Sequence, residues 1–193
     1  MRRRSGLNFG KQRKKFNLPL FKEILTWAGE IILIIVIAGI LVSFFGVRTT
    51  VVGQAMAETL SSGDQILINK FQYVISDPKQ GDVVVFLPNG NEKSHYYVRR
   101  VIAVPCDTVQ IKEGAVYVNE ELYMEDIEVS SIEEAGIASE PITLEKGEYF
   151  VLGDNRNNSS DSREPSVGNV RKNNIIGRAV IRIWPVTEAG LVR

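Results

Sequence analysis

Apolar residues follow two patterns along the chain, and the first is one long run near the N-terminus. Residues 31–47 are uncharged and consist mainly of Ile, Leu, Val and Phe, and the mostly apolar residues 24–28 extend the run backwards. Because about twenty apolar residues span a bilayer, we expect residues 24–47 to form a single transmembrane anchor. Glu30 lies near one end of this segment, where its carboxylate can reach the headgroup layer or be protonated.

The second pattern, beyond residue 48, consists of short apolar or alternating segments separated by turn residues, with no long helical period. Such segments are typical of β-strands. The predicted strands are Gln65 to Phe71, Asp82 to Leu87, Tyr96 to Val104, Thr108 to Ile111, Ala115 to Asn119, Glu148 to Leu152 and Ile175 to Trp184.

Turn signals of the kind that antiparallel strands require lie between these segments. They are Gly63-Asp64, Gly81-Asp82, Asn89-Gly90, Glu113-Gly114 and Lys146-Gly147. Pro185 is expected to close the last strand, since proline cannot donate to a ladder. The fold class predicted is mostly β: one N-terminal transmembrane helix followed by an antiparallel β domain over residues 48–193.

Charge is distributed unevenly, although the formal net charge is zero. The first 23 residues are rich in Lys and Arg against Glu23 alone. Basic residues directly before an apolar run mark the cytoplasmic flank of a membrane helix. We therefore expect a cytoplasmic tail (1–23), an anchor (24–47) and an extracytoplasmic domain (48–193), as in a single-pass protein of the cell membrane. The same placement favours a membrane over nucleic acid as the partner of the basic tail.

A cleaved signal peptide is the alternative to a retained anchor, because Ala55-Met56-Ala57 resembles a small-residue cleavage site. The apolar run is longer than is usual for a signal peptide, and Ala57 lies ten residues beyond Val47, farther than such a site normally falls. Both observations favour the retained anchor.

Cys106 is the only cysteine and His95 the only histidine, so no internal disulfide can form. A free cysteine usually behaves as a small buried hydrophobe, and we expect Cys106 to do so. His95 follows a polar loop and is expected to be solvated. One cysteine and one histidine do not make a metal site, so the sequence predicts no metal and no cofactor.

Residues 53–60 carry the first of three motifs and read Gly-Gln-Ala-Met-Ala-Glu-Thr-Leu. The string resembles the first motif of the bacterial type I signal peptidases, Gly-x-Ser-Met-x-Pro-Thr-Leu. Gly53 and Met56 match, as do the final Thr-Leu pair. Ala55 stands at the position of the nucleophilic serine, and Glu58 at that of the proline.

Two further segments follow in the order of the same family. Residues 97–107 resemble the motif Tyr-Val-Lys-Arg-Val-Ile-Gly-x-Pro-Gly-Asp, with Arg99 at the position of the lysine base and Ala103 and Cys106 at glycine positions. Residues 153–163 match Gly-Asp-Asn-Arg-x-x-Ser-x-Asp-Ser-Arg at every specified position, and Gly168-x-Val170 continues the match. By these motifs the chain is identified as a member of the signal peptidase I family, of the Gram-positive type.

The resemblance implies a reaction and the loss of its two central groups. In the family a Ser-Lys dyad hydrolyses a peptide bond of an exported precursor. The methyl group of Ala55 cannot attack a carbonyl, and the guanidinium of Arg99 does not deprotonate in proteins, so it cannot serve as base. The resemblance therefore implies a catalytically inactive paralogue with degenerate nucleophile and base positions.

The remaining motif residues are expected to form a supporting frame for this site. By resemblance, Gly53 shapes the first loop, Met56 belongs to the same frame, and Ser159 supports the residue at the base position. The ion pairs and hydrogen bonds of the frame are assigned, also by resemblance, to Asp154, Arg156, Asp161 and Arg163. Glu58 either places a carboxylate beside the cleft or pairs with Arg99.

The function expected from this resemblance is binding without cleavage. The chain would bind exported or pilus-type precursor proteins as an assembly accessory or chaperone, alone or beside an active signal peptidase. The alternative is an active signal peptidase with a nonstandard nucleophile, for which Thr59, Ser61 and Ser62 lie close in sequence. The acidic stretch 120–148 is either a solvated insertion or a second docking surface.

Overall fold

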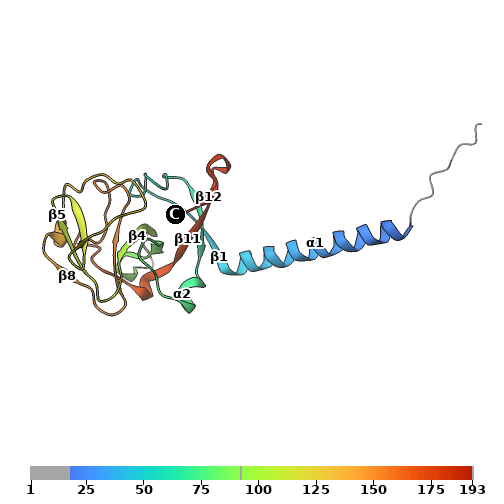
Figure 1. Cartoon of the computed structure of the whole chain (residues 1–193), viewed down its shortest axis with the longest axis horizontal. Coiled ribbons are helices and arrows are strands. Elements are labelled where there is room, and N and C mark those ends of the chain that lie inside the picture. The colour runs from blue at the N-terminus through green and yellow to red at the C-terminus, as the bar shows by residue number, and fades with distance from the viewer. Residues whose placement is uncertain (1–17, 92, 193) are drawn as a thin grey trace, which may run out of the picture. The chain divides into compact units, whose positions relative to one another are not determined.

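The computed structural model describes residues 18–91 and 93–192 (Figure 1). Most of the predicted basic tail lies outside these ranges. The chain divides into two compact units, residues 1–42 and 43–193.

Helix α1 (Leu18–Phe45) makes up the described part of the first unit and ends at the start of the second. Pro19 is tolerated because it lies in the first turn, and the helix ends directly before Gly46. Residues 46 and 47, which the predicted anchor included, belong instead to strand β1. All described side chains between residues 19 and 39 are exposed. Among the described residues, no helix has both the length and the apolar character needed to cross a membrane.

The second unit is mostly antiparallel β-structure, as the sequence predicts. Its larger sheet has the strand order β1-β2-β11-β3-β4-β9-β10, with β12 pairing with β11, and a smaller sheet has the order β7-β6-β5-β8. The strands of the larger sheet are β1 (Gly46–Thr50), β2 (Gln65–Asn69), β3 (Val83–Phe86), β4 (Tyr97–Ala103), β9 (Glu148–Leu152), β10 (Val170–Arg171), β11 (Ile175–Trp184) and β12 (Gly190–Leu191). Those of the smaller sheet are β5 (Thr108–Lys112), β6 (Ala115–Val118), β7 (Glu121–Leu122) and β8 (Ile142–Thr143).

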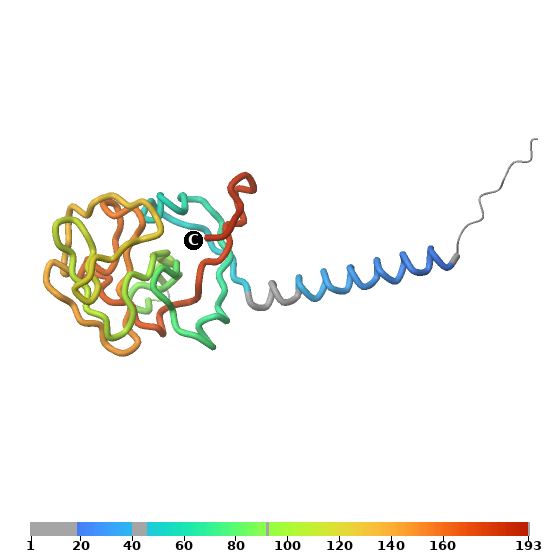
Figure 2. The backbone as a smooth tube through the Cα atoms, in the orientation of Figure 1, coloured from blue at the N-terminus to red at the C-terminus, as the bar shows by residue number. Residues whose placement is uncertain are grey.

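Short helical turns complete the unit, and all of them connect strands. They are α2 (Gln72–Ile75), η1 (Pro88–Gly90), η2 (Gly136–Ser139), η3 (Lys172–Asn174) and η4 (Val186–Glu188). Figure 2 traces the backbone of this unit. The segment that forms the smaller sheet lies at one end of the unit, and β1 and β12 lie at the other.

All seven predicted strands are present, within two residues at each end. Each predicted turn contains a glycine at positive φ, and β11 ends at Trp184, directly before Pro185. Strand β1 and four two-residue strands were not predicted. The acidic stretch 120–148 contributes β7, β8 and η2, and most of its carboxylates are exposed.

The prediction for Cys106 is wrong, because this side chain is exposed. Its backbone φ is +74°, in the left-handed region that favours glycine, so a tight turn and not the core determines its position. His95 is exposed in the loop before β4, as predicted.

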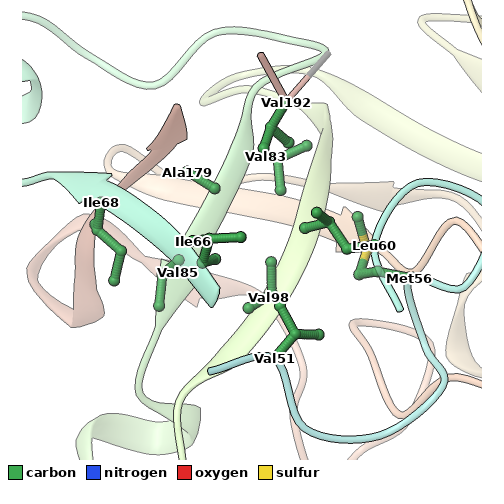
Figure 3. Close-up of a cluster of buried hydrophobic side chains, with 10 residues drawn as sticks. All are labelled: Val51, Met56, Leu60, Ile66, Ile68, Val83, Val85, Val98, Ala179 and Val192. Carbon is green, nitrogen blue, oxygen red and sulfur yellow. The ribbon is translucent and has the colours of Figure 1, made fainter. Parts of the chain in front are cut away.

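Alternation along the strands buries apolar side chains in three clusters, and one of them lies beside the motif residues. This cluster joins the segment after β1 to strands β2, β3, β4 and β11 (Figure 3). Its members are Val51, Met56, Leu60, Ile66, Ile68, Val83, Val85, Val98, Ala179 and Val192. The first motif is therefore packed directly on the larger sheet.

Candidate functional site

The segment between β1 and β2 carries Ala55 and is closed by its own backbone. Val51 N donates to Asp64 O at 2.8 Å, and Gly63 N donates to Val51 O at 2.9 Å. Gly53 has a φ of +90°, and its amide donates to Ser62 Oγ at 3.3 Å. A residue with a Cβ would be strained at this φ, which explains the glycine of the motif.

Met56 anchors this loop to the sheet. Its side chain is 1% exposed and lies in the same cluster as Leu60 from the loop and Val98 from β4 (Figure 3). The burial of the neighbouring apolar side chains thus holds Ala55, which is 8% exposed, at the surface of the larger sheet.

The third motif, residues 153–163, lies against Ala55. Asn155 N donates to Ala55 O at 3.0 Å, and Asn155 Nδ2 donates to Gln54 O, also at 3.0 Å. A Cβ on Gly153 would lie 2.2 Å from Ser159 Oγ and 2.5 Å from Ala55 O. Only glycine fits at this contact, and Ser159 and Ala55 are neighbours across it.

Arg99 approaches the same motif from β4 and is 7% exposed. Its Nε and Nη2 donate to Ser160 O at 3.0 and 2.6 Å, and its Nη1 donates to Val98 O at 2.7 Å. The guanidinium carbon also lies 4.9 Å from the centre of the Tyr97 ring, a cation–π distance. The structure thus brings Ala55 and Arg99 to one loop, residues 153–161.

The charge of Arg99 is not matched by a close carboxylate. Within residues 18–91 and 93–192, no carboxylate lies within salt-bridge distance of this side chain. Burial lowers the pKa of the Arg99 guanidinium, and the more distant charge of Asp161 opposes this effect. The group nevertheless remains a cation, because an arginine does not deprotonate in proteins.

Arg100, the next residue of β4, points to the other face of the strand and binds the frame. Its Nε and Nη2 donate to the two carboxylate oxygens of Asp154 at 2.8 and 2.7 Å. Burial alone would lower the pKa of Arg100, but the hydrogen bonds and charge of Asp154 outweigh it and raise that pKa. Thr59 Oγ1 donates to the same carboxylate at 2.5 Å, so Asp154 joins the first motif to the second and third.

Two further ion pairs hold the third motif in shape. Arg163 Nε and Nη2 donate to Asp161 at 2.8 and 2.9 Å, and Gly153 N donates to Asp161 Oδ2 at 3.0 Å. Arg156 donates to Gly153 O at 3.0 Å and forms a buried ion pair with Glu125. Glu125 belongs to the acidic stretch 120–148, so at least this carboxylate of the stretch has a structural role.

Two expectations about the site are not met. Ser159 Oγ is buried and has no hydrogen-bond partner among the residues that the structure describes, so it does not support Arg99, whose guanidinium instead bonds the carbonyl of Ser160. Glu58 is exposed and forms no ion pair with Arg99 in the described part of the chain.

Two of the three hydroxyl groups considered as a replacement nucleophile are hydrogen-bonded, and the third residue, Ser61, is exposed. Thr59 donates to Asp154, and Ser62 Oγ accepts from the Gly53 amide. His95 is exposed on its loop. Across the described ranges, no group of three or more His, Cys, Asp or Glu side chains is arranged to hold a metal ion.

Comparison with known proteins agrees with the three motifs. The family described as signal peptidase, peptidase S26, matches residues 24–184. The chain belongs to this family. Signal peptidase I P of Bacillus subtilis subsp. natto is 32% identical over 183 residues, which cover 91% of this chain and 94% of that protein. Signal peptidase IB of Staphylococcus aureus (strain COL) is 35% identical over 184 residues, 86% of this chain and 93% of that one.

A solved structure is also similar, that of a signal peptidase I from Enterococcus faecalis V583. It is 26% identical and covers 54% of this chain and 97% of its own, with a TM-score of 0.42. The assignment to the family rests on the family match and on the two relatives above.

Sequence reasoning missed three residues that complete the site. Arg100 was given no role of its own, although adjacent residues of a strand face opposite sides, so that Arg100 must contact a different group from Arg99. Tyr97 carries the ring beneath the Arg99 guanidinium. Glu125 was one of many carboxylates in an acidic stretch, and no local pattern distinguishes it as the partner of Arg156.

Proposed function

We propose that the domain of residues 48–193 binds exported or pilus-type precursor proteins without cleaving them, as an assembly accessory or chaperone. The observation that carries this proposal is the pair Ala55 and Arg99. These residues stand at the nucleophile and base positions of the family's motifs, and both contact the loop of residues 153–161.

Loss of hydrolysis follows from the chemistry of these two side chains. Covalent catalysis needs a nucleophile activated by an adjacent base, and neither a methyl group nor a permanently charged guanidinium supplies one. In the Ser-His-Asp proteases, removing a member of the triad leaves only about 10³ to 10⁴ over water. By analogy, turnover by this protein is expected to be negligible.

Retention of binding is supported by the intact frame around the site. Buried ion pairs such as Arg100–Asp154 and Arg163–Asp161 persist, and breaking a buried pair is strongly destabilising. The contacts of Asp154 with Arg100 and Thr59 join the loop around Ala55 to β4 and to the third motif. A site kept in shape without its reacting groups is suited to recognition.

The placement in the cell is part of the proposal. We infer that residues 24–45 anchor the domain in the cell membrane as a single-pass segment, with the N-terminus in the cytoplasm. The uncharged run 31–47 and the basic residues before it support this placement. An active signal peptidase is a further candidate partner at that membrane, whereas nucleic acid is not expected to bind.

An active signal peptidase is the second candidate, because the relatives are named as signal peptidases. It would require a nonstandard nucleophile. Of the three candidates, the hydroxyl groups of Thr59 and Ser62 are hydrogen-bonded within the frame, which argues against these two, whereas Ser61 is exposed.

Binding of a precursor by the full chain tests the proposal. We would mix detergent-solubilised protein with an exported precursor that carries its signal peptide and, separately, with the mature form of the same protein. The proposal predicts that the precursor co-purifies uncut. If the folded chain retains neither form, the proposal is wrong, and cleavage of the precursor would favour the second candidate.

A further inference from the structure

Arg99 has hydrogen-bonding capacity that the described chain does not use. A guanidinium carries five N–H donors, and three hydrogen bonds are present, from Nε, Nη1 and Nη2 to the carbonyl oxygens of Ser160 and Val98. Each terminal nitrogen therefore keeps one N–H without a partner among the described residues. One free N–H on each of two terminal nitrogens is the pair of donors that a carboxylate accepts in a bidentate contact.

The carboxylates nearest to Arg99 are engaged with other groups. Asp161 accepts three hydrogen bonds from Arg163 and one from Gly153. Glu164, whose charge also acts on Arg99, is exposed. Among the described residues, the groups that hydrogen-bond the guanidinium or lie at cation–π distance from it are two backbone carbonyls and the Tyr97 ring, none of which carries a full negative charge.

A buried cation without a counter-ion is costly. The carbonyl dipoles and the ring reduce this cost but do not neutralise the charge. An anion that reached Arg99 would form a charge-assisted hydrogen bond in a setting of low dielectric, where such bonds are strong. A lysine at this position could lose its proton, whereas an arginine keeps its positive charge at every physiological pH and so continues to attract an anion.

Residues beside Ala55 are accessible to a peptide. Ala55 contributes only a methyl group and, like Arg99, is slightly exposed. The adjoining residues 52–54 are exposed. Ser159 Oγ is buried without a hydrogen-bond partner among the described residues, and it lies next to the carbonyl of Ala55. Its hydroxyl is a second hydrogen-bond donor close to Ala55.

We propose that the site at Ala55 binds a carboxylate group of a peptide, with the Arg99 guanidinium as its ion-pair partner. This inference rests on the proposed binding of exported proteins and names the chemical group that is recognised. The carboxylate is supplied either by the C-terminus of a peptide or by an acidic side chain.

The test measures binding of three forms of one short peptide to the detergent-solubilised full chain by isothermal titration calorimetry. The peptide ends in Ala-Gln-Ala, a small-residue end of the kind found at signal-peptide cleavage sites. The first form has a free C-terminal carboxylate, the second a C-terminal amide, and the third a C-terminal amide with Asp in place of Gln. We expect at least one carboxylate form to bind about tenfold more tightly than the plain amide.

Three variants assign any preference to Arg99. Arg99→Gln is expected to bring the affinity ratio of carboxylate to amide close to one, and Arg99→Lys to keep part of it. Arg171→Gln removes an exposed arginine elsewhere on the domain and should leave the ratio unchanged. The affinity of the amide peptide shows in each variant whether the site is still folded.

Three outcomes would overturn the inference. Equal binding of all three forms to the native chain would leave peptide binding standing but exclude carboxylate recognition. A preference that survives in Arg99→Gln would place the cation elsewhere. If no form binds, the inference fails, and the precursor experiment then decides separately whether the proposed function fails with it. If only the Asp form is preferred, the carboxylate that Arg99 recognises belongs to a side chain.

Discussion

Removal of the Asp154 carboxylate should lower the stability of the domain much more than removal of an exposed carboxylate. Asp154 is fully buried and accepts two hydrogen bonds from Arg100, which is 4% exposed, and one from Thr59. The Asp154→Ala variant leaves the Arg100 cation buried without its counter-ion. Breaking a buried pair in this way costs about 3–5 kcal/mol.

The matched control is the exposed pair between Lys172 and Asp77, whose side chains are 37% and 74% exposed. Exposed ion pairs contribute about 0–1 kcal/mol, so Asp77→Ala should change the stability little. In a chain of this size about 1 kcal/mol shifts the midpoint of thermal unfolding by about 2–4 °C. Asp154→Ala should therefore lower the midpoint by about 6–20 °C, and Asp77→Ala by about 4 °C at most.

Thermal unfolding of the full chain in detergent, followed by circular dichroism of the β-structure, measures both effects. The double variant Arg100→Met/Asp154→Leu replaces both charges by apolar groups and should recover most of the loss, because no buried charge is left unpaired. Equal shifts for Asp154→Ala and Asp77→Ala, or no recovery in the double variant, would refute the reasoning that an uncompensated Arg100 causes the loss.

Three further results follow from particular contacts. Gly153→Ala should destabilise the domain by about 1–3 kcal/mol through overpacking, whereas Gly190→Ala, which meets no atom within 4 Å, should be nearly neutral in the same thermal assay. Burial raises the pKa of Tyr73, with Asp82 adding to the effect, so the folded state keeps a proton that the unfolded state loses. The free energy of unfolding should then fall as the pH rises above about 10, and it should fall less steeply in Tyr73→Phe. Urea titrations at several pH values measure this free energy, and the same dependence on pH in both proteins would contradict the expectation. Cys106, exposed at positive φ, should react with a thiol reagent without denaturant, and Cys106→Gly should raise the unfolding midpoint, since the left-handed conformation costs a side chain about 1–2 kcal/mol.

Most of the β-structure could be predicted because burial on one or both faces of a strand leaves a pattern in the sequence. Strand β1 could not, because Gly46 and Val47 continue the apolar run of the helix, and their partners Asn69 and Ile68 in β2 lie far along the chain. The four two-residue strands are too short for any period to be visible. Their existence depends on tertiary pairing.

The same distinction holds at the site. The resemblance implies that the third motif frames the position of Ala55, and in the structure Asn155 of this motif donates to Ala55 O. The direction of a long side chain has no such signal. Arg99 turns to the carbonyl of Ser160 and leaves Ser159 without a partner, and Arg156 takes its counter-ion from Glu125 in a separate stretch.

Cleavage of a signal-peptide-bearing precursor tests the central claim most directly, namely that this fold retains the site of a signal peptidase without its chemistry. We would compare the purified native chain in detergent with the Ala55→Ser/Arg99→Lys double variant and with Ala55→Ser alone, which lacks a base. We expect no cleavage by the native chain and cleavage by the double variant. Cleavage by the native chain that persists through repurification would contradict this claim. If neither the native chain nor the double variant cleaves the precursor, recognition of precursors has been lost as well.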